Sequence, residues 1–141
     1  MSAPRRRSSI TIRDSWIAVS QAYDDRAARN FALSTDVRLL SAARARIEFN
    51  GHSHFGRGEL RHILSKVNER TGEVSDLSNS ALSRAIDRMV EARMLLPGSW
   101  SECLIHDPFT VQTGVKGYET ECPAKPHGLS KNFQSAGIPS V

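Results

Sequence analysis

The chain has 141 residues, of which 39% are hydrophobic and only 6% aromatic. This length allows one domain with its own core, and no apolar run reaches the roughly 20 residues of a membrane helix. The basic N-terminus has no apolar segment after it, so we expect no secretory signal. Two cysteines are too few for a disulfide framework. We therefore expect a small cytoplasmic protein, mainly α (α+β), that does not enter the membrane.

The net charge of +4 comes entirely from the first thirteen residues. Their four cations precede the first acidic residue and are Arg5, Arg6, Arg7 and Arg13. The rest of the chain has fifteen basic and fifteen acidic residues, so it is neutral. Residues 1–13 are predicted to be a flexible basic arm, which could lie along phosphates, enter a minor groove or act only as a solubilising tail.

Residues 14–33 are predicted to be an N-terminal extension that packs on the core. Apolar residues in its first half can share one side of a helix: Trp16, Ile17, Val19 and Tyr23. This pattern stops near the acidic pair Asp24-Asp25. The segment is therefore expected to be a short helix or strand that docks Trp16 on the core.

A stronger helix is predicted from Ser34 onward. Ser34 or Thr35 can cap its first turn, and Asp36 suits the positive end of the helix dipole. Its expected buried stripe is Val37, Leu40, Ala43 and Ile47. Its arginines are expected to point elsewhere: Arg38, Arg44 and Arg46. Asn50-Gly51 should end the helix, since both residues accept the left-handed conformation.

The middle of the chain predicts a brief strand, a second helix and a polar loop. Residues 53–55 are the expected strand, and the helix should begin near Arg57. Its predicted buried residues are Leu60, Ile63, Leu64 and Val67. Residues 68–76 are polar and contain Thr71-Gly72, which predicts a loop.

An amphipathic helix is predicted over residues 78–93, with Ser78 as its N-cap. Its apolar residues recur at helical spacing: Leu82, Ala85, Ile86, Met89 and Val90. Pro97-Gly98 predicts a turn, and residues 102–106 a strand. Residues 110–141 are polar and interrupted by glycine and proline, which predicts an irregular, flexible C-terminal tail.

This order of elements resembles the winged helix-turn-helix, a DNA-binding fold. The resemblance rests on the order and spacing, on Leu77-Ser78-x-x-Ala81-Leu82-x-Arg84-Ala85-Ile86, and on Glu91-Ala92-Arg93-Met94-Leu95. It is closest to bacterial, phage or plasmid regulators and replication-accessory proteins. It implies a winged helix-turn-helix domain over residues 34–109 with a short β-hairpin wing, which binds double-stranded DNA and, as a homodimer, could read two half-sites.

In such a protein the helix over residues 78–93 would enter the major groove. Its expected contacts with bases come from Asn79, Ser80, Ser83 and Arg84, with Arg88 a weaker candidate farther along. The expected phosphate contacts are Arg57, Arg61, Lys66, Arg5, Arg6 and Arg7. Asp87 opposes this interpretation, because a carboxylate there would face phosphate or pair with Arg84. The wing tip, residues 97–101, also has no lysine or arginine.

A zinc site is a second hypothesis. Cys103-x2-His106 and Cys122-x4-His127 provide two thiols and two imidazoles in paired short spacings, and zinc favours four such ligands. The alternatives are a Cys103 that acts as a small apolar core residue, or a Cys103–Cys122 disulfide. His52 and His54 would share a face of a strand beside Glu59 and His62, which is a weaker metal-binding pattern.

Enzyme signatures are missing from the sequence, which contains no phosphate loop, no Gly-x-Ser-x-Gly and no His-Glu-x-x-His. We therefore expect no enzyme. The main alternative to DNA binding is a protein-binding module with the same fold, which the neutral body of the chain and the uncharged wing with Trp100 favour. A structural or assembly component would need no special residues.

Overall fold

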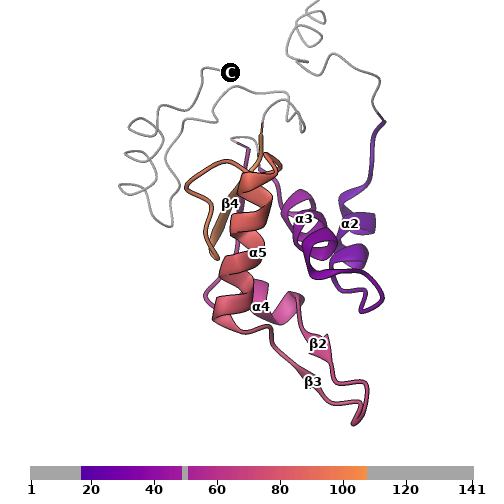
Figure 1. Cartoon of the computed structure of the whole chain (residues 1–141). Helices are drawn as coiled ribbons and strands as arrows, with labels where there is room; N and C mark the ends of the chain where they lie inside the picture. The colour runs from indigo at the N-terminus through magenta and orange to yellow at the C-terminus, as the bar shows by residue number, and fades with distance from the viewer. Residues whose placement is uncertain (1–16, 49–50, 108–141) are drawn as a thin grey trace, which may run out of the picture.

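The computed structural model describes residues 17–48 and 51–107. They form a small mixed α+β domain with four helices and two small antiparallel sheets (Figure 1). The elements in order are α2 (Gln21–Ala28), α3 (Thr35–Ala45), β1 (His52–His54), α4 (Glu59–Ile63), β2 (Lys66–Val67), β3 (Val74–Ser75), α5 (Asn79–Glu91) and β4 (Cys103–Ile105). The arm and tail expected at residues 1–13 and 110–141 lie outside the described residues. Among those described, no helix is long and apolar enough to cross a membrane.

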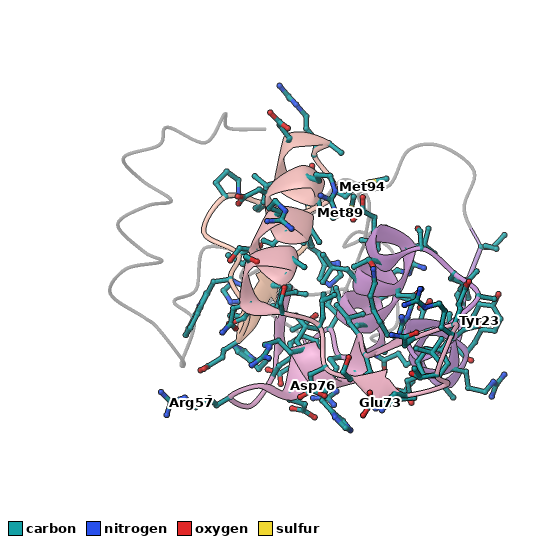
Figure 2. All side chains as sticks on the ribbon, turned by 60° about the horizontal axis from the view of Figure 1, so that its bottom comes forward. Tyr23, Arg57, Glu73, Asp76, Met89 and Met94 are labelled. Atoms are coloured by element: carbon teal, nitrogen blue, oxygen red, sulfur yellow. The ribbon has the colours of Figure 1, made fainter. Side chains whose placement is uncertain are left out.

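Helix α2 packs against α3, but through different residues than the sequence predicted. The expected contact residues Ile17, Val19 and Tyr23 are 82%, 48% and 57% exposed, and Tyr23 lies at the outer edge of the domain (Figure 2). The side facing α3 instead buries Ala28 and Asp24, whose carboxylate accepts two hydrogen bonds from Arg44 at 3.1 and 3.3 Å. The apolar pattern predicts the wrong contact side of α2, because the ion pair with Arg44 allows the acidic Asp24 to be buried. Trp16 is outside the described residues.

Helix α3 begins where predicted, with the Ser34 hydroxyl accepting the Val37 amide at 3.3 Å. Its predicted buried stripe is wrong in part: Val37 is 50% exposed, whereas Leu39, Ala42 and Ala43 are buried. Arg38 also points inward and is only 3% exposed. Its guanidinium donates to the carbonyls of Ala28 at 2.8 Å and Ile63 at 3.0 Å, which satisfies the buried charge and ties three segments together.

Helix α4 is shorter than predicted, because it starts after Gly58, whose φ of +73° is left-handed, and ends at Ile63. Leu60, Ile63 and Leu64 are buried as expected. Val67 is in β2 instead, and part of the predicted loop is a hairpin in which Lys66 pairs with Ser75 and Val67 with Val74. This β2–β3 hairpin is largely exposed and projects from the domain (Figure 1).

Helix α5 lies across the core as the amphipathic pattern predicted. The Ser78 hydroxyl accepts the Ala81 amide at 3.1 Å, which confirms the N-cap. The apolar side buries Leu82, Ala85 and Ile86, with Met89 and Val90 partly buried. These residues join one cluster with α3 and α4, whose fully buried members include Leu39, Leu60 and Leu64.

The strand β4 lies between two other segments. On one edge it pairs with β1, and in this antiparallel register His52 is paired with Ile105, Ser53 with Leu104 and His54 with Cys103. On the other edge, residues 95–96 return from α5 and bridge to His106 and Ile105. Pro97-Gly98 begins the connecting turn as predicted. Side chains alternate along a strand, so Ser53 and Leu104 face the core while His52, His54, Cys103 and Ile105 share the other face.

Candidate functional site

The first candidate site is the solvent-facing side of α5 and the start of α4. In the N-terminal half of α5, Asn79, Ser80, Ser83 and Arg84 are all exposed, because the apolar residues at positions 81, 82, 85 and 86 face the core at helical spacing. Arg57, in the turn before α4, extends away from the domain (Figure 2). Within the described part of the chain, neither Arg57 nor Arg84 has a hydrogen bond or ion pair through its guanidinium. Both cations are thus available to a ligand.

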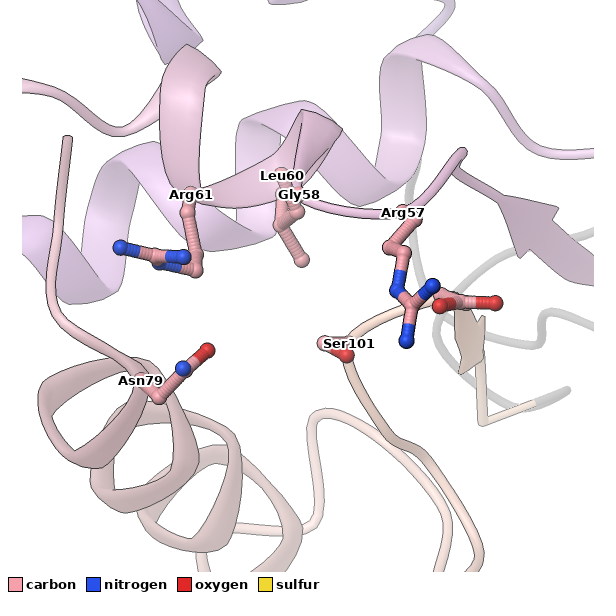
Figure 3. Close-up of a pocket in the computed structure, with 7 residues that line it drawn as sticks. Arg57, Gly58, Leu60, Arg61, Asn79 and Ser101 are labelled. Atoms are coloured by element: carbon pink, nitrogen blue, oxygen red, sulfur yellow. The ribbon is translucent and has the colours of Figure 1, made fainter.

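A shallow pocket of about 230 Å³ lies between these elements. In Figure 3, Arg57 and Arg61 lie on the α4 side, and Asn79 and Ser101 face them from α5 and the loop before β4. Three predicted DNA-contact residues therefore meet here. The volume is below the roughly 300–1,000 Å³ of typical small-molecule sites, so the pocket fits a group such as a phosphate better than a whole metabolite.

Arg61 holds α4 and α5 in position. Its Nε donates to the Leu77 carbonyl at 2.6 Å, and the Leu77 amide donates back to the Arg61 carbonyl at 3.1 Å. These two bonds fix the entry to α5 beside the pocket. The remaining nitrogens of the guanidinium can still contact a ligand, because Arg has five N–H donors.

Arg88 is placed differently from the other predicted DNA contacts. Its guanidinium donates three hydrogen bonds to Asp36 on α3, at 2.8, 3.0 and 3.3 Å. The hydrogen bonds from Arg88 lower the pKa of Asp36, and those to Asp36 raise the pKa of Arg88. Lys66 is exposed on the β2–β3 hairpin, away from α5. Arg88 lies one turn after Arg84 on α5 but is already paired with Asp36, and Lys66 belongs to a different element.

Acidic residues limit the positive charge of this surface. Asp87 is exposed on α5 one turn after Ser83 and Arg84, as the sequence suggested, and no ion pair in the described residues joins it to Arg84. Glu102 also lines the pocket. Trp100, which the sequence places at the tip of a predicted wing, is partly buried and packs against Cys103 and Ile105.

The second candidate site is a group of His and Cys side chains on the outer face of the β1–β4 sheet. Donor atoms of His52, His54 and Cys103 all lie within 4.8 Å of one another, so the group could hold a metal ion. Cys103 Sγ is 3.6 Å from His52 Nδ1. His54 Nδ1 is 3.2 Å from Glu48 Oε1, while its Nε2 is buried and has no hydrogen-bond partner among the described residues.

The predicted zinc ligands are not assembled by the described residues. His106 is on the core side of the sheet, where its Nε2 lies 3.0 Å from Ser53 Oγ and 3.1 Å from the Ala43 carbonyl. Burial lowers the pKa of this imidazole to about 4. Cys122 and His127 lie outside the described residues. Cys103 instead joins His52 and His54, which the sequence had suggested as a separate pair.

Glu59 and His62, which the sequence pattern places beside His52 and His54, have other partners. Glu59 accepts hydrogen bonds from Arg46 and from the Gly56 amide, and these lower its pKa to about 2. His62 is exposed and lies 3.0 Å from Asp76. Only the antiparallel register between β1 and β4 brings Cys103 to the histidines, and spacing along the sequence does not reveal a register.

Comparison of the chain with protein-family models, with curated proteins and with solved structures finds no match. Its function is therefore argued from the two sites themselves. The α4–α5 surface is open, polar and partly cationic, whereas the His/Cys group is small and mostly buried. The first suits a large polar ligand and the second suits a single ion.

Proposed function

We propose that the chain is a winged helix-turn-helix protein that binds double-stranded DNA, with α5 in the major groove. The order α3, β1, α4, α5 supports this fold, as does a hairpin in which residues 95–96 and β4 pair next to β1. In that fold, α4 and α5 are the two helices of the helix-turn-helix, and residues 97–102 are the tip of the wing. The β2–β3 hairpin is then an insertion between the two helices.

The observation that carries the proposal is the row of exposed polar residues on the N-terminal half of α5. An N-terminal half is the part of a recognition helix that reaches base edges. Arg84 can bind guanine through two hydrogen bonds, Asn79 can do the same with adenine, and Ser80 and Ser83 can bond to bases or phosphates. The exposed guanidinium of Arg84 is presented without a partner in the described chain, which suits it to this role.

Phosphate contacts would come from the residues beside α5. Arg57 and Arg61 flank the pocket next to Asn79, and a backbone phosphate placed there would meet both cations. Such contacts fix the register of the protein on the duplex without reading sequence. The arginine arm of residues 5–7 would add further, sequence-independent affinity. A regulator or a replication accessory is the expected biological role, and a dimer would let two copies of α5 read successive half-sites.

Duplex binding by matched arginine variants tests this function. The full chain should bind labelled genomic fragments at low salt, and Arg84→Ala should weaken the preferred fragment by about tenfold, the lower half of the range for a bidentate base contact. Arg26→Ala, which removes an exposed cation from α2 on the other side of α3, is the control and should bind like the wild type. Equal losses for the two variants would mean that only net charge matters.

A protein-binding module is the competing function, and exposed apolar side chains favour it. Phe31, Val37 and Met94 are 49%, 50% and 40% exposed and could contribute to a contact with a partner. Lack of duplex binding at low salt, with the fold intact by circular dichroism, would favour this alternative over DNA binding.

A further inference from the structure

We propose that this chain binds one zinc ion through His52, His54 and Cys103. The proposal is independent of DNA binding, because the three residues lie on the β1–β4 sheet and not on the α4–α5 surface. It also differs from the zinc site that the cysteine and histidine spacings suggest, since it uses neither His106 nor the residues after position 110.

The two strands place the three side chains on one face. His52 and His54 are two apart in β1, and side chains in a strand alternate, so they point to the same side. Cys103 is the direct antiparallel partner of His54, and directly paired residues also share a face. Two histidines and a cysteine from segments fifty residues apart in the sequence are thus held together by backbone hydrogen bonds.

The donor distances suit a tetrahedral ion. Zinc–sulfur bonds of about 2.3 Å and zinc–nitrogen bonds of about 2.0–2.1 Å put sulfur and nitrogen ligands roughly 3.5 Å apart at tetrahedral angles. Cys103 Sγ and His52 Nδ1 are 3.6 Å apart. The whole donor group fits within 4.8 Å, so small side-chain rotations are enough to bring the third ligand to the ion.

His54 has the hydrogen bonding typical of a metal ligand. Its Nδ1 faces the Glu48 carboxylate at 3.2 Å. A carboxylate on one ring nitrogen fixes the tautomer and leaves the other nitrogen with its lone pair directed at a metal. That other nitrogen, Nε2, is buried and has no hydrogen-bond partner within residues 17–48 and 51–107. The His54 side chain is 21% exposed, in contrast to the fully buried His52, and gives the ion a route from solvent.

The donor types select zinc over other common ions. Thiolate and imidazole suit zinc, whereas calcium and magnesium prefer oxygen ligands. Leu96 and Trp100 pack against Cys103 and Ile105, and this apolar cover would strengthen the attraction between a thiolate and a cation. Water is sufficient as a fourth ligand. The bound ion would join β1 to β4 and so stabilise the hairpin that follows α5.

Native mass spectrometry of the full chain, after incubation with zinc and removal of the excess, tests the proposal. We expect one zinc per chain, at least about tenfold weaker binding in His54→Gln, and a similar weakening in Glu48→Ala, where the positioning carboxylate is lost. His62→Gln removes an exposed histidine from α4 and should bind like the wild type. A wild-type chain that stays metal-free would overturn the proposal.

Two further results make the test decisive. Retention of zinc by His54→Gln at wild-type affinity would place the ion elsewhere, for example at Cys103, His106, Cys122 and His127, and would contradict the proposal. Cobalt offers a measurement that needs no His54 variant. The wild-type cobalt complex should show the intense visible bands of a tetrahedral site and a thiolate charge-transfer band that Cys103→Ser abolishes. A cobalt spectrum without the thiolate band would also contradict the proposal.

Discussion

The polar surface of α4 and α5 and the polar interior around α3 and the β1–β4 sheet use similar residues in opposite ways. On the surface, the guanidinium groups of Arg57 and Arg84 have no partner in the described chain. In the interior, Arg38 donates to two carbonyls and His106 contacts Ser53 and Ala43. Buried polar groups must be satisfied and exposed ones need not be, so the interior arrangement follows from folding. The exposed guanidinium groups are satisfied by water and remain available to an external ligand.

The largest expected effect is that of zinc on the interior. If His52, His54 and Cys103 bind the ion in the folded state only, free zinc at about a thousand times its dissociation constant stabilises the fold by about 4 kcal/mol. For a domain of this size the melting temperature should rise by more than about 10 °C and fall again with a chelator. A melting temperature that changes with neither zinc nor chelator would contradict the zinc proposal and would leave the buried histidines and cysteine explained by folding alone.

The next effect is the pH dependence caused by His106. Burial lowers its pKa to about 4, below the value of about 6.5 in an unfolded chain, so the unfolded state takes up the proton first. The neutral, buried imidazole contributes to the free energy of unfolding fully above pH 6.5, and this contribution falls by about 3 kcal/mol as the pH approaches 4. Denaturant titrations between pH 6.5 and 4 should show this loss of unfolding free energy. His106→Gln should make the loss smaller, whereas the exposed control His62→Gln should leave it unchanged. Equal slopes for the two variants would contradict this role.

A pair of arginine substitutions compares interior and surface directly. Arg38→Ala leaves the carbonyls of Ala28 and Ile63 without their donor and opens a gap beside α3, so unfolding should become easier by about 3 kcal/mol. Arg84→Ala on the exposed side of α5 should change stability by less than about 0.5 kcal/mol. Chemical denaturation measures both. Similar losses for the two variants would mean that Arg84 also has a structural role.

The smallest expected effect is the loss of DNA affinity on substitution of Arg88, which is compared with that of Arg84 on the same helix. Asp36 already binds the guanidinium of Arg88, whereas that of Arg84 is unpaired within the described residues. Arg88→Ala should therefore reduce DNA affinity much less than the roughly tenfold loss expected for Arg84→Ala. Parallel titrations with the same duplex measure the difference. A larger loss for Arg88→Ala would indicate that the ion pair opens and that this end of the helix contacts DNA.

Local signals in the sequence predicted the elements better than their packing. Ser34 and Ser78 marked two helix starts because a hydroxyl cap acts on the next few amides, all within reach of the local sequence. The buried face of α3 differs from the predicted one because Arg38, a charged residue that favours exposure, is buried. Its burial depends on carbonyls of Ala28 and Ile63, which lie on other segments. The short β2–β3 hairpin was missed since its residues are polar and largely exposed.

The candidate sites were predictable to different degrees. The polar side of α5 could be identified from helical periodicity, because the apolar residues at positions 82, 85 and 86 determine which residues face outward. The partnership of Arg88 with Asp36 could not, since it joins two helices. His52, His54 and Cys103 are all candidate metal ligands from the sequence, but in two separate hypotheses. Cys103 belongs to the set with His106, Cys122 and His127, and the two histidines form a pair of their own. The pairing of His54 with Cys103 depends on strand register, which arises only when the sheet forms.

The salt dependence of duplex binding tests the central claim, that this chain binds DNA, most directly. Cations such as Arg57 and Arg61 would displace counterions from phosphates, and each phosphate contact contributes about 0.9 to the slope of log affinity against log salt. The account predicts measurable binding of the full chain at low salt and a steep loss of affinity as salt rises. No binding at low salt, or an affinity independent of salt, would contradict it.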